Sequence, residues 1–134
     1  AEAVEFVKHT SVDCLAVAVG TAHGLYEGET PELDFERLAE LREAVPVPLV
    51  LHGGSSTGDD KLALAVKTGI SKINLFSDLS SAGTNAVKSL LASGKTTPLG
   101  FLPLSMVYGA GVEAYKQMVM HYIEVFGSRG VLDA

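Results

Sequence analysis

Two histidines, each followed directly by glycine, are the most chemically informative residues of this sequence. His23 precedes Gly24, and His52 precedes a pair of glycines. Neutral imidazole is a good zinc ligand, and a catalytic zinc takes three protein ligands and keeps one position open. A single histidine of this kind is more often a hydrogen-bonded structural residue, but two in equivalent places favour a shared metal. Asn74 adds a third polar position after an apolar stretch.

The glycines beside the histidines predict a phosphate site. Glycine lets the backbone come close to a ligand, and consecutive amide N–H groups form a concavity that binds anions. The helix expected from about residue 60 directs its positive N-terminus at the same region. The backbone and hydroxyl donors expected there come from Gly24, Gly53, Gly54, Ser55, Ser56, Thr57 and Ser77. The simpler alternative is that GGSSTG is a flexible turn and that Asp78 only caps a helix.

Apolar strands that alternate with amphipathic helices must position these residues. The continuous apolar run 14–19 predicts a fully buried strand, as in a parallel sheet that is covered on both faces. Further strands are predicted at 49–51 and 72–75. The helices are predicted at 35–45 with Asp34 or Thr30 as the cap, from Asp59 or Asp60 to Gly69, at 78–92, and at about 112–126.

Three consecutive strand–helix units predict a parallel sheet with right-handed crossovers. Ligands of parallel α/β folds bind at the carboxyl ends of the strands, which is where both histidines and Asn74 are expected. Three strands cannot close a barrel, because an eight-stranded barrel takes roughly 250 residues. The periodicity leaves two architectures open, a small open α/β domain or about half of a barrel.

Composition excludes several classes of partner. The chain has 134 residues, 47% of them hydrophobic, and a net charge of −6. No run of Lys or Arg occurs, so we expect no nucleic acid and no anionic membrane surface as a partner. No stretch of eighteen apolar residues predicts a membrane span. Cys14 is the single cysteine, so we expect a buried thiol and a cytoplasmic location.

Four segments resemble the class II, zinc-dependent ketose-bisphosphate aldolases. They are VDCLAVAVGTAHGLYEG, LDFERL, PLVLHGGSS and KINLFSDL, and they match in order and spacing over nearly the whole chain. The nearest type acts on fructose or tagatose 1,6-bisphosphate. The resemblance implies a TIM (β/α)8 barrel, with residues 1–134 as its C-terminal half, a single incomplete domain that covers about the last three strands and their helices.

The resemblance also implies roles for individual residues. His23 and His52 match two of the three zinc-ligating histidines of the family. The positions that match its phosphate-binding and monovalent-cation (Na or K) residues are Gly24, Gly53, Gly54 and Ser55, and Ser77 matches a phosphate-binding threonine. Asn74 matches an asparagine that contacts the substrate. The implied activity is reversible cleavage of the ketose bisphosphate to dihydroxyacetone phosphate and glyceraldehyde 3-phosphate.

Two departures from the family pattern leave other functions open. Phe76 stands where the family commonly has Asp or a small residue, so the choice among ketose bisphosphates is in doubt. No Asp-His-Gly triplet for the catalytic Asp and third zinc histidine occurs in this sequence. We therefore expect a complementary half to supply both, and the chain alone to be inactive and to assemble, with a homo-oligomer as the expected state. The alternatives are a non-catalytic phosphosugar-binding fragment and a metal-free α/β enzyme.

Overall fold

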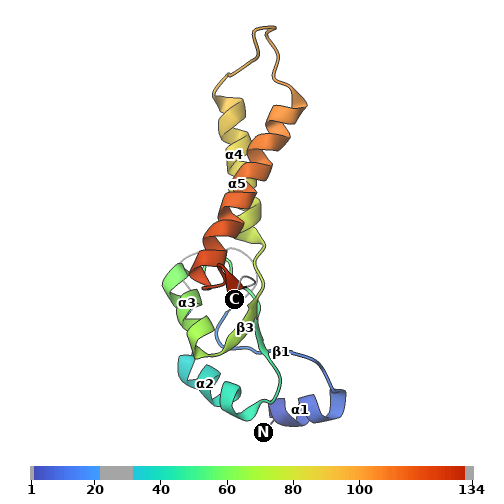
Figure 1. The fold of residues 1–134 in the computed structure, drawn as a ribbon, viewed down its shortest axis with the longest axis vertical. Helices are drawn as coiled ribbons and strands as arrows, with labels where there is room; N and C mark the ends of the chain where they lie inside the picture. The colour runs from blue at the N-terminus through green and yellow to red at the C-terminus, as the bar shows by residue number, and fades with distance from the viewer. Residues whose placement is uncertain (1, 22–31, 132–134) are drawn as a thin grey trace. The chain divides into compact units, whose positions relative to one another are not determined.

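A computed structural model describes residues 2–21 and 32–131 of the chain (Figure 1). It comprises two compact units. The first contains Ala1–Leu75 and Val125–Gly127, and the second contains Phe76–Glu124 and Ser128–Ala134. In the described part of the chain, no helix combines the length and the apolar character that crossing a membrane requires.

The first unit is built on a three-stranded parallel sheet in the order β1-β2-β3. The strands are β1 (Leu15–Ala16), β2 (Leu49–Leu51) and β3 (Ile70–Ile73). The helices of this unit are α1 (Glu2–Thr10), α2 (Phe35–Ala44) and α3 (Asp59–Thr68), as Figure 1 shows. The parallel α/β arrangement predicted from the alternating pattern is confirmed. The central strand β2 is buried at all of its positions.

The prediction of a fully buried first strand at 14–19 is wrong. Only Leu15–Ala16 is a strand, Ala16 is exposed, and Val19 is the one buried residue of the run. The thiol of Cys14 is exposed as well, against expectation. The physical reason is position, because β1 lies at one edge of the described sheet and pairs there with β2 alone. An apolar run indicates that a strand can be buried, but the elements around it decide whether it is.

The cap at the start of α2 and the glycine at the end of α3 are as predicted, whereas the N-terminal cap of α3 is Gly58 rather than Asp59 or Asp60. The side chain of Asp34 accepts a hydrogen bond of 2.8 Å from the backbone N–H of Arg37, which satisfies one of the first amides of α2. Gly69, at φ 132°, ends α3 in a conformation that other residues rarely adopt. The chain enters β3 immediately afterwards at Ile70, two residues before the predicted start at Lys72.

The second unit contains the helices α4 (Ser77–Ala92) and α5 (Leu104–Val125). The start of α4 agrees with prediction to one residue, whereas α5 begins at Leu104 rather than near Val112. The sequence between these positions contains Gly109 and Gly111, which weaken a helix prediction. In the structure a Cβ on Gly83 of α4 would lie 3.2 Å from the carbonyl oxygen of Gly111, so the missing side chains let the two helices approach closely.

The apolar residues at helical spacing along α5, which form a stripe from Val112 to Tyr122, are mostly exposed. Tyr122 is buried, but Val112 is 67% and Tyr115 is 42% exposed. Tyr122 also donates a hydrogen bond of 2.6 Å from its hydroxyl to Oδ2 of Asp78 at the start of α4. One end of the stripe therefore packs against α4, and the rest presents apolar side chains at the surface.

Candidate active site

The carboxyl end of β2 carries the first candidate residue. His52 follows Leu51 directly, and its side chain is exposed at the end of a strand that is itself buried. The carbonyl oxygen of His52 accepts a hydrogen bond of 2.7 Å from Oγ1 of Thr21. Thr21 belongs to the segment that follows β1 (Leu15–Ala16), so this segment is joined to the end of β2 beside the histidine.

The loop after β2 is also tied to the end of β3. The backbone N–H of Gly54 donates to the carbonyl oxygen of Asn74 at 3.2 Å, and the N–H of Asn74 donates to the carbonyl oxygen of Leu51 at 2.9 Å. These two bonds continue the pairing of β2 and β3 past the last strand residues. The structure thus brings together Asn74, His52 and the glycine loop at the carboxyl end of the sheet, as the sequence predicted.

The glycine loop forms a turn with an internal hydrogen bond and two left-handed residues. Gly53 at φ 66° and Ser56 at φ 60° adopt left-handed backbone conformations. Ser55 and Thr57 are buried, with exposed fractions of 4% and 1%. Oγ1 of Thr57 donates to the carbonyl oxygen of Gly53 at 3.2 Å. The expectation that Thr57 offers its hydroxyl proton to a ligand is therefore wrong, because the loop itself accepts that hydrogen bond.

Helix α3 begins directly after this loop, as predicted, but its first turn carries two carboxylates. Gly58 is the N-terminal cap and provides no side-chain bond, and Asp59 and Asp60 occupy the first positions. Their negative charges stabilise the helix dipole. They also oppose an anion near the same amides, so the glycine loop, rather than the helix terminus, is the stronger candidate for phosphate binding.

Several predicted site residues are not brought into this geometry. His23 and Gly24 lie outside the described residues. Ser77 is the first residue of α4 and belongs to the second unit. Phe76 precedes it and is 73% exposed. Across residues 2–21 and 32–131, no three His, Cys, Asp or Glu side chains gather as a metal would require.

The two remaining histidines have other partners. His9 lies on α1, where Nδ1 is 2.7 Å from the backbone oxygen of Glu5. His121 lies on α5 with its ring edge-on to that of Tyr122, the centroids being 5.2 Å apart.

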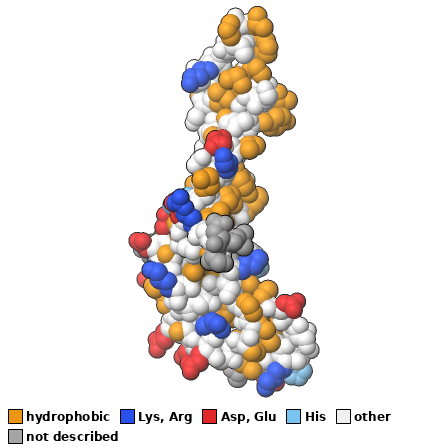
Figure 2. All heavy atoms as spheres, viewed as in Figure 1, with side chains coloured by type: hydrophobic (Ala, Val, Ile, Leu, Met, Phe, Trp, Pro, Cys, Tyr) orange, Lys and Arg blue, Asp and Glu red, His pale blue; other side chains and the backbone are white. Residues whose placement is uncertain are grey.

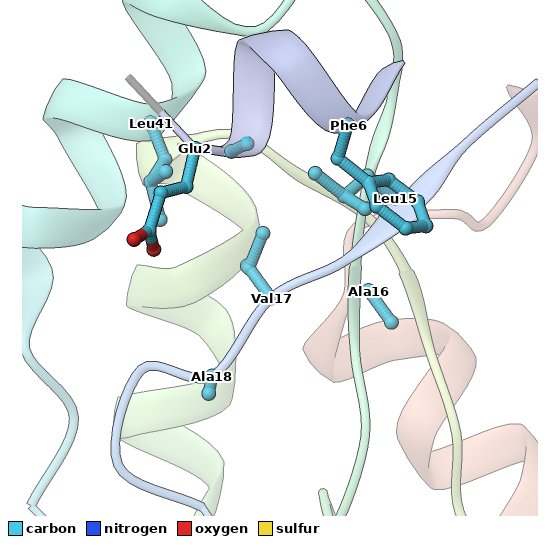
Figure 3. Close-up of a pocket in the computed structure, with 8 residues that line it drawn as sticks. Glu2, Phe6, Leu15, Ala16, Val17, Ala18 and Leu41 are labelled. Atoms are coloured by element: carbon cyan, nitrogen blue, oxygen red, sulfur yellow. The ribbon is translucent and has the colours of Figure 1, made fainter. Parts of the chain in front are cut away.

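A separate apolar cavity of about 470 Å³ lies between α1, α2 and the β1 segment (Figure 3). Figure 3 shows Phe6 and Leu15 close together on one side of it, with Leu41 and Glu2 on the other. Its other lining residues are Ala3, Ala16, Val17 and Ala18. Glu2 is the one titratable group among these residues, so the cavity lacks the donor and acceptor groups of a catalytic site. It is an apolar hollow open to the surface, with Phe6 51% exposed at its side.

Sequence reasoning missed two polar residues at the sheet edge. Thr21 was not considered, although it is a hydroxyl residue shortly after an apolar run, which is the signal that identified the other positions. Lys72 stands at the start of the predicted strand 72–75, where the sequence alone gives it no role. In the structure its ammonium group is hydrogen-bonded to Oδ1 of Asn74.

Comparison with known proteins agrees with the parallel α/β fold of the chain. The family described as fructose-bisphosphate aldolase class II matches residues 1–131, and the chain belongs to that family. The YdjI aldolase of Escherichia coli K12 superposes with a TM-score of 0.80 at 36% identity, over 96% of this chain and 44% of that one. A Coccidioides immitis protein assigned as a fructose-1,6-bisphosphate aldolase gives a TM-score of 0.80 at 28% identity, over 98% of this chain and 44% of its own.

The chain therefore spans less than half the length of these two structures. Its parallel strands and helices are part of a TIM-barrel fold, which decides between the two architectures that the periodicity left open.

Proposed function

We propose that this chain is the C-terminal half of a zinc-dependent ketose 1,6-bisphosphate aldolase and holds its metal- and phosphate-binding residues. The substrate would be fructose or tagatose 1,6-bisphosphate, cleaved reversibly to dihydroxyacetone phosphate and glyceraldehyde 3-phosphate. This proposal rests on two hydrogen bonds in a member of the class II family. The Thr21–His52 bond joins the segment after β1 to the end of β2, and the Gly54–Asn74 bond joins the loop after β2 to the end of β3. Parallel α/β enzymes place their active sites at this carboxyl end of the sheet.

His52 and His23 are the proposed zinc ligands. The exposed imidazole of His52 at a fixed strand end fits a metal, but the described residues do not complete a ligand set. A catalytic zinc needs three protein ligands, so the third must come from the complementary half of the barrel. Zinc, when bound, acts as a Lewis acid that polarises the substrate carbonyl and stabilises the negative charge that develops there.

The glycine loop would hold a phosphate of the substrate. The proposed donors are the backbone amides of Gly24, Gly53 and Gly54, with hydroxyl and amide groups from Ser55 and, by family resemblance, Ser77. Ser55 is 4% exposed and lies between two residues with left-handed backbone conformations, Gly53 and Ser56. Loop carbonyls of the same segment would bind Na or K.

Asn74 would contact an oxygen of the bound substrate, while the complementary half would contribute the Asp that moves a proton. That Asp would donate the proton to the aldehyde oxygen in condensation and accept it from the same oxygen in cleavage. Because this sequence contains no matching Asp-His-Gly, the chain on its own would not turn over substrate.

The test combines the chain with the complementary half and measures aldol cleavage with and without EDTA. We expect EDTA to abolish cleavage and zinc to restore it. A His52→Ala variant should lose bound zinc and activity together, whereas the matched control His9→Ala, on an exposed face of α1, should keep both.

Two other outcomes would select the alternative functions. Phosphosugar binding that ignores EDTA, without cleavage, would identify a non-catalytic binding fragment, for which the exposed Phe76 is the motivating feature. Full activity in His52→Ala would identify a metal-free enzyme.

The single thiol, Cys14, is unpaired and exposed, which agrees with a proposed cytoplasmic location.

We also propose that the chain forms a homo-oligomer through the exposed side of α5. Figure 2 shows hydrophobic side chains gathered over the helical pair. Those that are exposed on α5 include Val112, Tyr115, Val119, Met120 and Ile123. Exposed apolar patches of this kind often mark interaction surfaces. Light scattering of the purified chain should give more than one copy per particle, and a monomer that melts cooperatively would contradict the proposal.

A further inference from the structure

Lys72 and Asn74 form a pair of side chains at the end of β3. Nζ of Lys72 donates a hydrogen bond to Oδ1 of Asn74. Side chains two residues apart in a strand point to the same face of the sheet, which explains how the two meet. Lys72 lies opposite Val50 of the buried strand β2. The backbone of Lys72 is therefore paired with a buried strand, while its side chain is exposed.

The chemistry of lysine fixes the orientation of the Asn74 amide. An ammonium group has three donors and no acceptor, so only the oxygen of the amide can face it. The backbone N–H and carbonyl of Asn74 are already bonded to Leu51 and Gly54. With Oδ1 turned to the ammonium group, Asn74 presents its Nδ2 amide hydrogens on the other side, and these can donate to a ligand.

The charge of Lys72 is not neutralised within the described part of the chain. The ion pairs found there join other lysines, arginines and a histidine to glutamates. A cation bonded to an amide oxygen polarises the amide and strengthens the hydrogen bonds that its N–H groups donate. Lys72 thus both orients Asn74 and makes it a better donor.

We infer that Lys72 is a positioning residue that holds Asn74 with its Nδ2 amine directed at an oxygen of the phosphorylated substrate. The inference rests on the proposed function, which assigns Asn74 to substrate contact. A donor aimed where negative charge develops lowers the barrier more than it improves ground-state binding. Loss of Lys72 should therefore reduce kcat with a smaller effect on KM.

The kinetic test uses the chain combined with the complementary half. In Lys72→Met we expect kcat to fall about tenfold, as is typical for loss of one charge-assisted hydrogen bond. Lys72→Arg keeps the positive donor and should recover part of the loss. Lys67→Met on the exposed side of α3 removes the same charge elsewhere and should leave kcat unchanged.

A double-mutant cycle separates positioning from direct action on the substrate. If Lys72 acts through Asn74, adding Lys72→Met to an Asn74→Ala variant should cause no further loss of kcat. If the full loss recurs in that background, Lys72 acts independently of Asn74 and the inference is overturned.

A spectroscopic readout keeps this inference separable from the proposed function. The ¹⁵N resonance of the Asn74 side-chain amide should shift in Lys72→Met, and its protons should exchange faster with water, but Lys67→Met should change neither. If the wild-type protein shows no aldol cleavage, the proposed function fails while this measurement still reports on the pair. Identical Asn74 amide spectra in wild type and Lys72→Met would refute the positioning role.

Discussion

Gly54 provides a sharp test of how the glycine loop is held, because there is no room for a side chain at this position. A Cβ added to Gly54 would lie 2.7 Å from Cγ2 of Ile73 and 3.2 Å from both the carbonyl oxygen of Asn74 and Cδ2 of Leu75. Carbon atoms in contact normally lie about 3.5–4.0 Å apart, so the new methyl group would intrude by roughly 1 Å on the nearest neighbour. Ile73 cannot swing aside easily, since Cγ2 is attached to the Cβ of a strand residue.

The energetic balance of Gly54→Ala follows from three terms. Overpacking of this kind costs about 1–3 kcal/mol. Displacing the loop would also weaken the 3.2 Å hydrogen bond from Gly54 to Asn74, worth about 0.5–1.5 kcal/mol. Replacing glycine by alanine makes the unfolded chain less flexible, which returns about 0.4–1 kcal/mol, and Gly54 is not among the residues with positive φ. The net expectation is a loss of about 2 kcal/mol in the free energy of unfolding.

Urea unfolding followed by circular dichroism, at one protein concentration for all variants, measures this loss. Gly109→Ala is the matched control, because a Cβ there would meet nothing within 4 Å and the position is inside α5. The control should be neutral or gain up to about 1 kcal/mol. In the combined protein, Gly54→Ala should also raise KM for the phosphorylated substrate. An unfolding midpoint equal to that of the wild type would refute the packing argument.

Three further predictions concern the core and the second unit. Leu38→Ala removes a side chain that is 0% exposed and should lower the free energy of unfolding by about 2–5 kcal/mol in the same urea assay; a loss below 1 kcal/mol would contradict the burial. Tyr122→Phe removes the 2.6 Å bond to Asp78 and should lower the free energy of unfolding by about 1.5–3 kcal/mol, and an unchanged melting temperature would contradict this contribution. The side-chain hydrogen bond from Gln117 lowers the pKa of Glu113, so a carbon NMR titration should find it below the usual range of glutamate, and Gln117→Ala should raise it. Because the folded-state pKa of Glu113 is the lower one, the stability contributed by its hydrogen bond is complete above the unfolded-state pKa and disappears as the pH falls through the folded-state pKa. A Glu113 titration that Gln117→Ala leaves unaffected would argue against the bond.

Much of the fold could be predicted because local signals and tertiary packing agree. Asp34 and Gly69 are capping residues in sequence and in structure, and β2 is as apolar as its complete burial requires. Prediction failed where residues far apart in the sequence decide the local structure or the burial of a side chain. The continuation of α5 through Gly111 depends on its contact with Gly83 of another helix, which no local window contains. The exposure of Cys14 depends on which elements cover the sheet edge.

The candidate site was predictable in its residues but not in its hydrogen bonds. The position of His52 and Asn74 after apolar strands was enough to place them at one edge of a parallel sheet. The sequence could not show that the Thr57 hydroxyl bonds within the loop, or that Lys72 faces Asn74. Side-chain partners of this kind depend on the register of β2 with β3, which is irregular between Leu49 and Val50.

The position of His52 directly after the fully buried strand β2 has a consequence for how such a protein changes over evolutionary time. Substitutions in β2 disturb the core and are selected against for stability alone, so the placement of the histidine is protected whatever the substrate. Phe76 is 73% exposed, and replacing an exposed side chain usually alters stability by less than about 0.5 kcal/mol. Under this division, the substrate preference of the proposed site can diversify through surface positions, while the proposed metal ligand is inherited together with the fold.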